Sequence, residues 1–284
     1  MRGQPGGKSR DRRRLEERGR NGATVGVVVL GSFRLAGRVS VRTGSGRGIR
    51  AGIARALSEA GADVALAART ESDLRAVAGD IEAQGSAALV VPGDLSTPGA
   101  MGDLVTSTVE RFGRLDIIVN NLGGTGPAAL LEVSERSFER AFSWNVTTAF
   151  NLTKAGVPHL LESDGAAVVN ISSAAGRHAS RGFTAYGTAK AALIQLTRHM
   201  AAELAPRIRV NTIAPGAIAT EALAGILTND LEEAVVGGTP LRRLGIVDDV
   251  AAAAVYLCSP ASAYVTGQVL PVDGGIQGSN LDLG

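Results

Sequence analysis

The sequence is poor in aromatic residues and contains a single cysteine. Aromatic side chains make up 4% of the 284 residues, and Cys258 has no second cysteine to pair with. An intrachain disulfide is therefore excluded, and the chain fits a reducing compartment, so we expect a cytoplasmic protein. The histidines lack the spacing of metal ligands, and no structural metal is expected. They are His159, His178 and His199.

Long apolar runs are also missing. The stretch from Ala23 to Leu30 is shorter than a membrane span, and we expect no membrane partner. The net charge is +2, but the first 20 residues hold eight basic and only three acidic side chains. The rest of the chain is net negative, which argues against nucleic-acid binding. We predict that residues 1–34 form a basic, disordered extension, with a targeting signal as the alternative.

Short β-rich runs alternate with segments of helical spacing from residue 35 onward. The runs are Val39–Val41, Val64–Ala67, Ala88–Val91, Ile117–Val119, Ala167–Ile171, Arg209–Ile213 and Val269–Val272. This alternation indicates parallel pairing through right-handed crossovers, and several runs are apolar on both faces. We therefore predict an α/β fold over residues 35–284: a single Rossmann-type, doubly wound parallel sheet of about seven strands with helices on both faces.

A glycine-rich turn follows the first predicted strand, with the sequence Thr43-Gly44-Ser45-Gly46-Arg47-Gly48-Ile49. Glycines at such a junction let the backbone approach a pyrophosphate, which the following helix N-terminus can bind. The turn predicts a dinucleotide site that uses Gly44, Arg47, Gly48 and Ile49. A purely structural turn is the alternative interpretation.

Residues after the next strands refine the nucleotide prediction. The second run is followed by Arg69, where a protein that selects NAD places a carboxylate for the ribose 2′-hydroxyl. A guanidinium suits a 2′-phosphate instead, with Arg47 as a second positive charge, so we expect NADP(H) to be preferred over NAD(H). Asp94 follows the third run and either accepts from the adenine amino group or caps a helix. Asn121 and Gly123 follow the fourth run, where small residues permit close passage of a cofactor.

A Tyr-x-x-x-Lys pair, Tyr186 and Lys190, lies in a segment of helical spacing, which puts both side chains on one face. A nearby ammonium lowers the pKa of a phenol, which is otherwise about 10, and so prepares it for acid–base work. Ser173 ends the fifth run, and Asn145 lies in the preceding helical segment. Residues 215–220 follow the sixth run. In this order, over roughly residues 35 to 276, the motifs resemble the short-chain dehydrogenase/reductase family.

The resemblance implies an oxidoreductase that transfers a hydride between NADP(H) and a carbonyl or secondary alcohol. Tyr186 would be the general acid, Lys190 would lower its pKa and hold the nicotinamide ribose, and Ser173 would hydrogen-bond the substrate oxygen. Asn145 would hold a water that links Lys190 to solvent.

The resemblance also assigns the segment after the sixth strand to the cofactor. Ile218 and Thr220 would orient the carboxamide, next to Pro215 and Gly216. The partners implied are a small carbonyl or alcohol substrate and three further copies of the chain, because members of the family form homotetramers.

Two arginines depart from the family's pattern. Arg50 stands where a third glycine is usual, and Arg42 replaces an apolar residue near the end of the first strand, where an unpaired buried charge is unfavourable. Three interpretations are open: the arginines bind cofactor phosphates, they crowd the site, or the first strand is displaced. We hypothesise that catalysis survives and that cofactor affinity is reduced.

The substrate has several candidate classes. Residues 120–127 and 213–223 resemble bacterial 7α-hydroxysteroid dehydrogenases, so a hydroxysteroid is one candidate. The rival enzyme is a 3-oxoacyl-carrier-protein reductase, whose acidic carrier requires a basic rim. Candidates for that rim are Arg136, Arg140, Arg177 and Arg181. A catalytically weak NADP(H)-binding sensor or scaffold is the alternative of another class. The segment of residues 221–240 is either an apolar lid over the substrate or a helix packed on the core.

Overall fold

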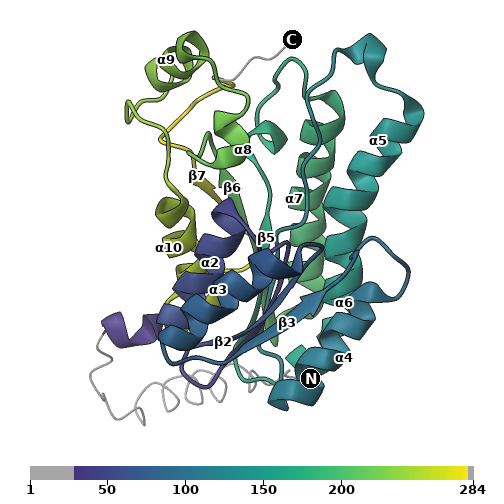
Figure 1. The fold of residues 1–284 in the computed structure, drawn as a ribbon, viewed down its shortest axis with the longest axis vertical. Coiled ribbons are helices and arrows are strands. Elements are labelled where there is room, and N and C mark those ends of the chain that lie inside the picture. Colours follow the sequence, from purple (N-terminus) through teal and green to yellow (C-terminus); the bar gives the residue numbers. More distant parts are fainter. Residues whose placement is uncertain (1–28, 281–284) are drawn as a thin grey trace, which may run out of the picture. The chain divides into compact units, whose positions relative to one another are not determined.

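The computed structural model describes residues 29–280, and within them seven parallel strands form one sheet (Figure 1). The strands are β1 (Val39–Thr43), β2 (Asp63–Ala68), β3 (Ala88–Pro92), β4 (Ile117–Asn120), β5 (Ala166–Ile171), β6 (Ile208–Pro215) and β7 (Val269–Val272). Their order across the sheet is β3-β2-β1-β4-β5-β6-β7. The predicted doubly wound α/β fold is confirmed, and each predicted β-rich run lies within one of these strands.

The chain divides into two units, Met1–Ser32 and Phe33–Gly284. Residues 1–28 of the predicted extension lie outside the described residues. Its described end forms η1, a 3-10 helix over Val29–Phe33. The second unit carries the sheet and all the helices that pack on it. Within residues 29–280, none of the helices has both the length and the apolar character needed to cross a membrane.

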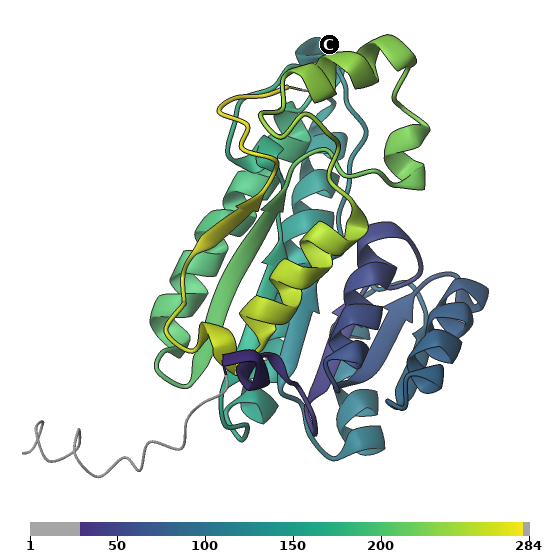
Figure 2. The same cartoon turned by 90° about the vertical axis from the view of Figure 1, so that its left-hand side faces the viewer.

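Helices cover both faces of the sheet, as the apolar strands predict (Figures 1 and 2). One face carries α2 (Gly48–Glu59), α3 (Glu71–Ala83) and α10 (Val247–Cys258), and the other carries α4 (Ala100–Phe112), α6 (Thr148–Leu160) and α7 (Thr184–Leu204). Three shorter helices are α5 (Glu135–Phe142), α8 (Glu221–Ala224) and α9 (Asn229–Gly237). Figure 2 shows α8 and α9 above the end of the sheet at which β6 ends.

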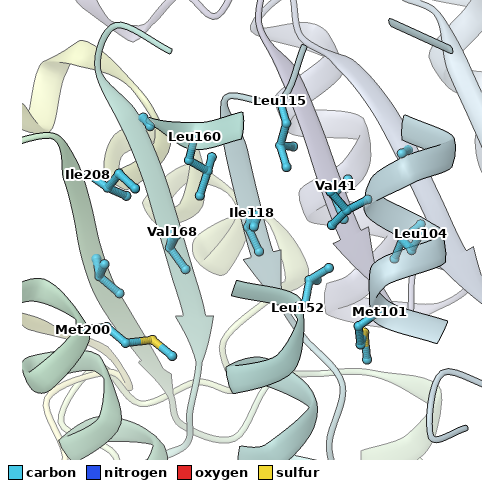
Figure 3. Packing of buried hydrophobic residues seen from close by; sticks show 14 of the residues in the cluster. Val41, Met101, Leu104, Leu115, Ile118, Leu152, Leu160, Val168, Met200 and Ile208 are labelled. Atoms are coloured by element: carbon cyan, nitrogen blue, oxygen red, sulfur yellow. The ribbon is translucent and has the colours of Figure 1, made fainter. Parts of the chain in front are cut away.

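The core consists of two apolar layers, one on each face of the sheet. Alternate residues of β4 supply both layers: Ile118 packs with α4, α6 and α7, whereas Ile117 and Val119 pack with α2 and α10. Figure 3 shows the first layer, in which Leu104 and Leu152 lie beside the strands. Because both layers are closed, the free carboxyl ends of the strands are the place where a ligand can reach the sheet.

The strand order reverses between β1 and β4. β1 pairs with β2 on one side and with β4 on the other. The crossovers from these two strands run in opposite directions, which opens a crevice at their carboxyl ends. The fold therefore places the glycine-rich turn after β1 and the residues after β4 at one crevice.

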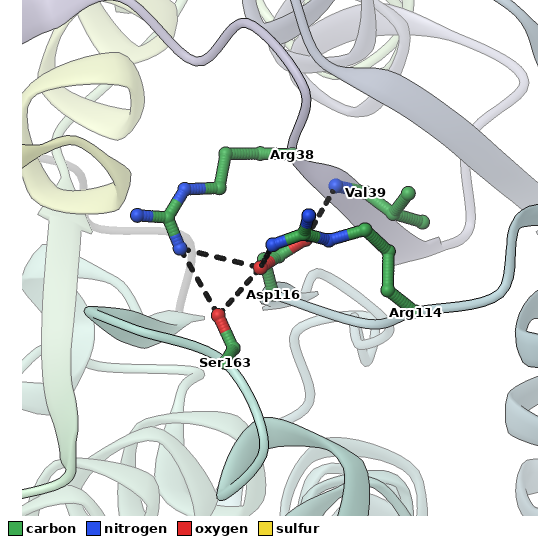
Figure 4. A network of polar contacts seen from close by, with 5 residues as sticks. All are labelled: Arg38, Val39, Arg114, Asp116 and Ser163. Atoms are coloured by element: carbon green, nitrogen blue, oxygen red, sulfur yellow. Dashed lines mark hydrogen bonds and ion pairs between the residues drawn. The ribbon is translucent and has the colours of Figure 1, made fainter.

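At the amino ends of the central strands, away from the crevice, a buried carboxylate connects the segments that precede the strands (Figure 4). Asp116 has no exposed side-chain surface, and it accepts hydrogen bonds from the side chains of Arg38, Arg114 and Ser163 and from the N–H of Val39. The Arg114 contact is bidentate, at 2.7 and 2.8 Å. Burial pushes the pKa of Asp116 upward, but the hydrogen bonds from Arg114, Ser163 and Val39 outweigh it and hold the pKa below its ordinary value.

Replacement Asp116→Asn is expected to lower the free energy of unfolding by about 2 kcal/mol at pH 7, because it removes the charge that two guanidinium groups face. The folded-state pKa is depressed, so the wild type should lose this advantage as the pH falls below about 4, and not as it rises. Urea unfolding at several pH values measures both effects. The control is Asp80→Asn in the half-exposed Arg55–Asp80 pair, where less than about 0.5 kcal/mol is expected. Equal losses in both variants would contradict a special role for Asp116.

Candidate active site

The Tyr-x-x-x-Lys pair lies near the start of α7. Tyr186 and Lys190 are one helical turn apart, and Lys190 Nζ is 5.6 Å from the centre of the Tyr186 ring. Lys190 is buried, and its Nζ donates to the carbonyl oxygen of Ile171, at the end of β5, at 2.8 Å. This bond fixes the lysine against the backbone of a central strand. The predicted pair is thus held in place at the carboxyl end of the sheet.

Ser173 follows β5 and caps η4 (Ala174–Gly176), where its Oγ accepts from a backbone N–H at 3.2 Å. Its hydroxyl also interacts with the phenol of Tyr186. The adjacent Ser172 instead donates to the carbonyl oxygen of Lys190 at 2.9 Å. Ser173, and not Ser172, is therefore the serine beside the phenol, as the sequence predicts.

Asn145 lies in η3 (Ser143–Thr147), a single π-helical turn between α5 and α6, and not in a regular helix. Such turns are frequent at functional sites. Asn145 Oδ1 accepts from the N–H of Gly124 at 3.1 Å. A Cβ on Gly123 would overlap with both Asn145 Oδ1 and Lys190 Nζ, so only glycine lets these two side chains meet there. The structure brings Asn145 and Lys190 together around Gly123.

Burial dominates the protonation of the catalytic candidates. It raises the pKa of Tyr186, while the Ser173 hydroxyl and the charge of Arg50 act in the opposite direction. Burial, with a smaller effect of Arg50, lowers the pKa of Lys190 to about 7. Sequence reasoning named Lys190 as the cation that lowers the pKa of Tyr186, whereas the cation that acts on the phenol here is Arg50. A protonated phenol suits a general acid.

The glycine-rich turn joins β1 to α2 as predicted. Gly44 and Gly48 have φ angles of 72° and 55°, a backbone region that glycine adopts without strain. Arg47 is the N-cap residue of α2, and no described side chain caps this helix. The first N–H groups of α2, including that of Ile49, therefore remain available to an anion.

A cavity of 340 Å³ lies between this turn and the ends of β2 and β3. Arg69 lines it, with an exposed side chain that has no ion-pair partner among residues 29–280. Arg47 also lines it, but its guanidinium pairs with Asp73 in the first turn of α3, at 2.9 Å. Asp73 therefore neutralises Arg47, the second positive charge that the sequence suggests for this site, and Arg69 remains.

Two residues of this cavity escaped the sequence analysis. Asp73 lies 26 positions from its partner Arg47, and no local pattern connects the two residues. Trp144, the only tryptophan of the chain, lines the cavity and packs against the core cluster that includes residues of α4 and α6. Its position directly before Asn145 was the signal that could have identified it.

Asp94 and Asn121 lie just after the strands β3 and β4. The Asp94 carboxylate is exposed and accepts from the N–H and hydroxyl of Ser96, at 2.9 and 2.7 Å. α4 begins only at Ala100, so the helix-cap alternative for Asp94 is wrong. Asn121 is fixed by its backbone, because its N–H donates to Thr43 Oγ1 at 3.2 Å. Its side-chain Nδ2 is buried and has no hydrogen-bond partner among the described residues.

The segment after β6 forms the far wall of the crevice. Pro215 ends β6, and a Cβ on Gly216 would lie 2.8 Å from Asp273 Cα, so this position requires glycine. Ile218 is buried, and Thr220 caps α8 with its side-chain oxygen, which accepts from a backbone N–H at 3.3 Å. The structure thus brings all four predicted residues of this segment to the site.

The two unusual arginines lie inside the protein. β1 pairs in register with both neighbours, so the idea of a displaced first strand is wrong. Arg42 is fully buried; its Nη1 donates to the carbonyl oxygen of Arg50 at 2.7 Å, and its Nε and Nη2 have no partner among the described residues. The Arg50 side chain donates to the carbonyl oxygens of Asn121 and Gly123, at 3.1 and 2.7 Å.

A cavity of 430 Å³ opens beside Tyr186 and Ser173. Its walls are mostly apolar, and none of its described lining residues is Asp, Glu, Lys or Arg. Leu223 and Ile226 line it from the segment after β6, which favours the lid interpretation of that segment. A second cavity, of 630 Å³, contains Lys190 and the turn before α2. Tyr186 and Ser173 line both cavities.

Comparisons with known proteins agree with this geometry. Residues 44–277 match the family described as enoyl-(acyl carrier protein) reductase. An uncharacterized oxidoreductase of Mycobacterium tuberculosis is 53% identical over 258 residues, covering 90% of this chain and 98% of its own. The structure of a 7α-hydroxysteroid dehydrogenase with NADH and 7-oxo glycochenodeoxycholic acid has a TM-score of 0.84 and 36% identity, covering 87% of this chain and 98% of its own.

A complex of Pseudomonas aeruginosa RhlG with NADP gives a TM-score of 0.82 at 38% identity and covers 86% of this chain and 98% of its own. Both structural relatives are similar enough in sequence to share the family and not only the fold, and both hold a nicotinamide dinucleotide. Together with the family match and the motifs assembled at the crevice, they establish that the chain belongs to the short-chain dehydrogenase/reductase family of NAD(P)-dependent oxidoreductases, which act on CH–OH groups.

Proposed function

We propose that residues 35–284 form an NADP(H)-preferring reductase of an uncharged, largely apolar ketone, or the corresponding alcohol dehydrogenase. One observation carries the proposal: Tyr186 and Ser173 line both the largely apolar 430 Å³ cavity and the 630 Å³ cavity that Lys190 lines. A substrate carbonyl in the first cavity would meet a hydroxyl pair at the wall of the second. This arrangement suits proton transfer to an oxygen while a hydride arrives from the other side.

In this proposal the chain's own residues position the substrate and move a proton. Ser173 donates to the carbonyl oxygen, and Tyr186 transfers its phenolic proton to that oxygen as the general acid. Lys190, held by the carbonyl of Ile171, stands one helical turn behind the phenol. Asn145 would relay protons to Lys190 through a water near Gly123, where the two side chains meet.

The residues fit a nicotinamide dinucleotide at both ends of the crevice. The uncapped N-terminus of α2 suits a pyrophosphate, and the buried, unpartnered Nδ2 of Asn121 lies beside it. Arg69 is a free donor for a 2′-phosphate, while the Pro215–Thr220 segment walls the nicotinamide end. When bound, the dinucleotide supplies the hydride.

Arg69→Ala is expected to raise the Kd of NADPH about tenfold and to leave that of NADH within twofold, because only NADPH has the 2′-phosphate that the guanidinium binds. Titration followed by nucleotide fluorescence measures both constants. Arg75→Ala is the matched control, since Arg75 lies on α3 and pairs with Glu71 outside the cavity. An equal weakening of NADPH and NADH by Arg69→Ala would refute the preference.

The cavity favours a free substrate over a carrier-bound one. Arg177, a candidate for a basic rim, is already paired with Asp273 at 2.7 Å. The cavity of 430 Å³ falls within the range of small-molecule sites, and its largely apolar lining suits an apolar ring system such as that of the steroid bound to the relative. A panel of ketosteroids, alicyclic ketones and 3-oxoacyl esters, assayed by NADPH oxidation, tests this. Turnover of acyl esters alone would favour the carrier-protein reductase, and NADPH binding without any turnover would favour a sensor.

The homotetramer implied by the resemblance is part of the proposal. Leu130, Leu131 and Phe150 are apolar side chains with exposed fractions of 68%, 99% and 42%, and they lie on or beside η2 (Leu130–Glu132) and α6. Apolar surface of this kind is typical of subunit contacts. Light scattering of the purified protein would give four times the chain mass if the proposal holds.

A further inference from the structure

The two ends of the dinucleotide crevice are cavities, whereas an arginine side chain lies between them. The adenosine side is the 340 Å³ cavity with Arg69 and Trp144, and the nicotinamide side is the 630 Å³ cavity with Lys190. Among the described residues, only Arg47 and Arg50 line both cavities. Arg47 is drawn toward α3 by Asp73, so Arg50 is the side chain that stands between the two compartments.

Arg50 crosses the crevice from α2 to the end of β4. Its stem passes over the first glycine of the turn: a Cβ on Gly44 would lie 3.0 Å from Arg50 Cδ and 3.2 Å from Nε. Its guanidinium ends on the carbonyl oxygens of Asn121 and Gly123, at 3.1 and 2.7 Å. A pyrophosphate that approaches the turn meets this side chain, because Arg50 lines both cavities and its stem lies over Gly44.

The backbone of Arg50 is also held in place, by the side chain of Arg42. Arg42 Nη1 donates to the Arg50 carbonyl oxygen at 2.7 Å, which fixes the backbone at the start of α2. Within residues 29–280 no carboxylate pairs with Arg50, so its charge is balanced only by carbonyl dipoles. To admit a dinucleotide, the guanidinium must leave both carbonyl oxygens and give up its place over Gly44.

We propose that Arg50 is a bar between the adenosine and nicotinamide compartments, so that it sets which nucleotides bind: a 2′-phosphorylated adenosine mononucleotide fills its compartment freely, whereas a dinucleotide must displace Arg50. The inference rests on the use of a dinucleotide by the family and not on the proposed ketone substrate. It adds to the proposed cofactor site a residue, Arg50, that disfavours the binding of a dinucleotide relative to a mononucleotide.

The test compares adenosine 2′-monophosphate with NADPH in the full-length wild type and in Arg50→Gly. Quenching of the single tryptophan reports both ligands without turnover, because Trp144 lines the adenosine compartment. We expect Arg50→Gly to lower the Kd of NADPH about tenfold or more, as two hydrogen bonds no longer need to break, and to leave the Kd of the mononucleotide within twofold.

The control is Arg55→Gly, the same substitution in the same helix, because Arg55 pairs with Asp80 away from the crevice. It should change neither constant. Arg50→Ala, which also lacks the stem but keeps helix propensity, serves if the glycine variant unfolds. An unchanged Kd of NADPH overturns the bar. A weaker binding of NADPH overturns it in favour of a guanidinium that binds the pyrophosphate, and equal tightening of both ligands overturns it because the mononucleotide does not have to displace Arg50.

Discussion

Replacement Tyr186→Phe is expected to lower kcat about a thousandfold while leaving the Kd of NADPH within a factor of about two. The phenol is the only described hydroxyl on α7 that lines both cavities, and it is beside Ser173, so its loss removes the proton donor. The ring itself stays. Phenylalanine keeps the contact with Phe183, whose ring centre is 6.0 Å away, and the fold should be unaffected.

Kinetics with the best ketone of the panel, together with a binding titration, separate loss of chemistry from loss of binding. The matched control is Tyr264→Phe, because the Tyr264 side chain is fully exposed and lines neither cavity. That variant should retain wild-type activity. If Tyr186→Phe kept more than a tenth of kcat, the acid would have to be sought elsewhere, with Ser173 as the next candidate.

The strands could be predicted because their burial produces a simple sequence pattern. β4 and β5 are buried on both faces, so their sequences are continuous apolar runs, and helices of regular spacing separate them. The predicted ends coincide with the observed ones or differ from them by at most two residues. Such edges depend on caps and turns, as at Pro215, which the sequence alone places in the loop after β6 and the structure includes in the strand.

The candidate catalytic residues could be named from the sequence for a different reason: their spacing repeats the pattern of a family. Spacing along one helix fixes Tyr186 against Lys190, and the end of β5 fixes Ser173. Contacts between distant segments have no such pattern in the sequence. Asp73 neutralises Arg47 from another helix, and the π-helical turn that positions Asn145 adds one residue without a recognisable sequence signal.

Arg42→Met is expected to raise the free energy of unfolding by about 3 kcal/mol at pH 7, which is unusual for a substitution in a central strand. Arg42 has no exposed surface, and two of its three side-chain nitrogens have no partner among the described residues. No carboxylate among residues 29–280 pairs with it, and Cys258 is the titratable group whose charge acts on Arg42. A cation desolvated in this way opposes folding, whereas a thioether of similar length fills the same space.

The pH dependence gives the prediction a second readout. Burial lowers the pKa of Arg42 to about 9 in the folded protein, well below the ordinary value of a free guanidinium. Between these values the unfolded chain binds more protons, so the wild type gains stability as the pH rises above about 9, and its deficit against Arg42→Met should shrink. Arg42→Lys, which keeps a buried charge, should show no gain at pH 7. Urea unfolding of the three proteins from pH 7 to 10 measures all of this. A less stable Arg42→Met would mean that the donation to the Arg50 carbonyl outweighs desolvation, and the arginine would then belong to the architecture of the bar as a stabilising anchor.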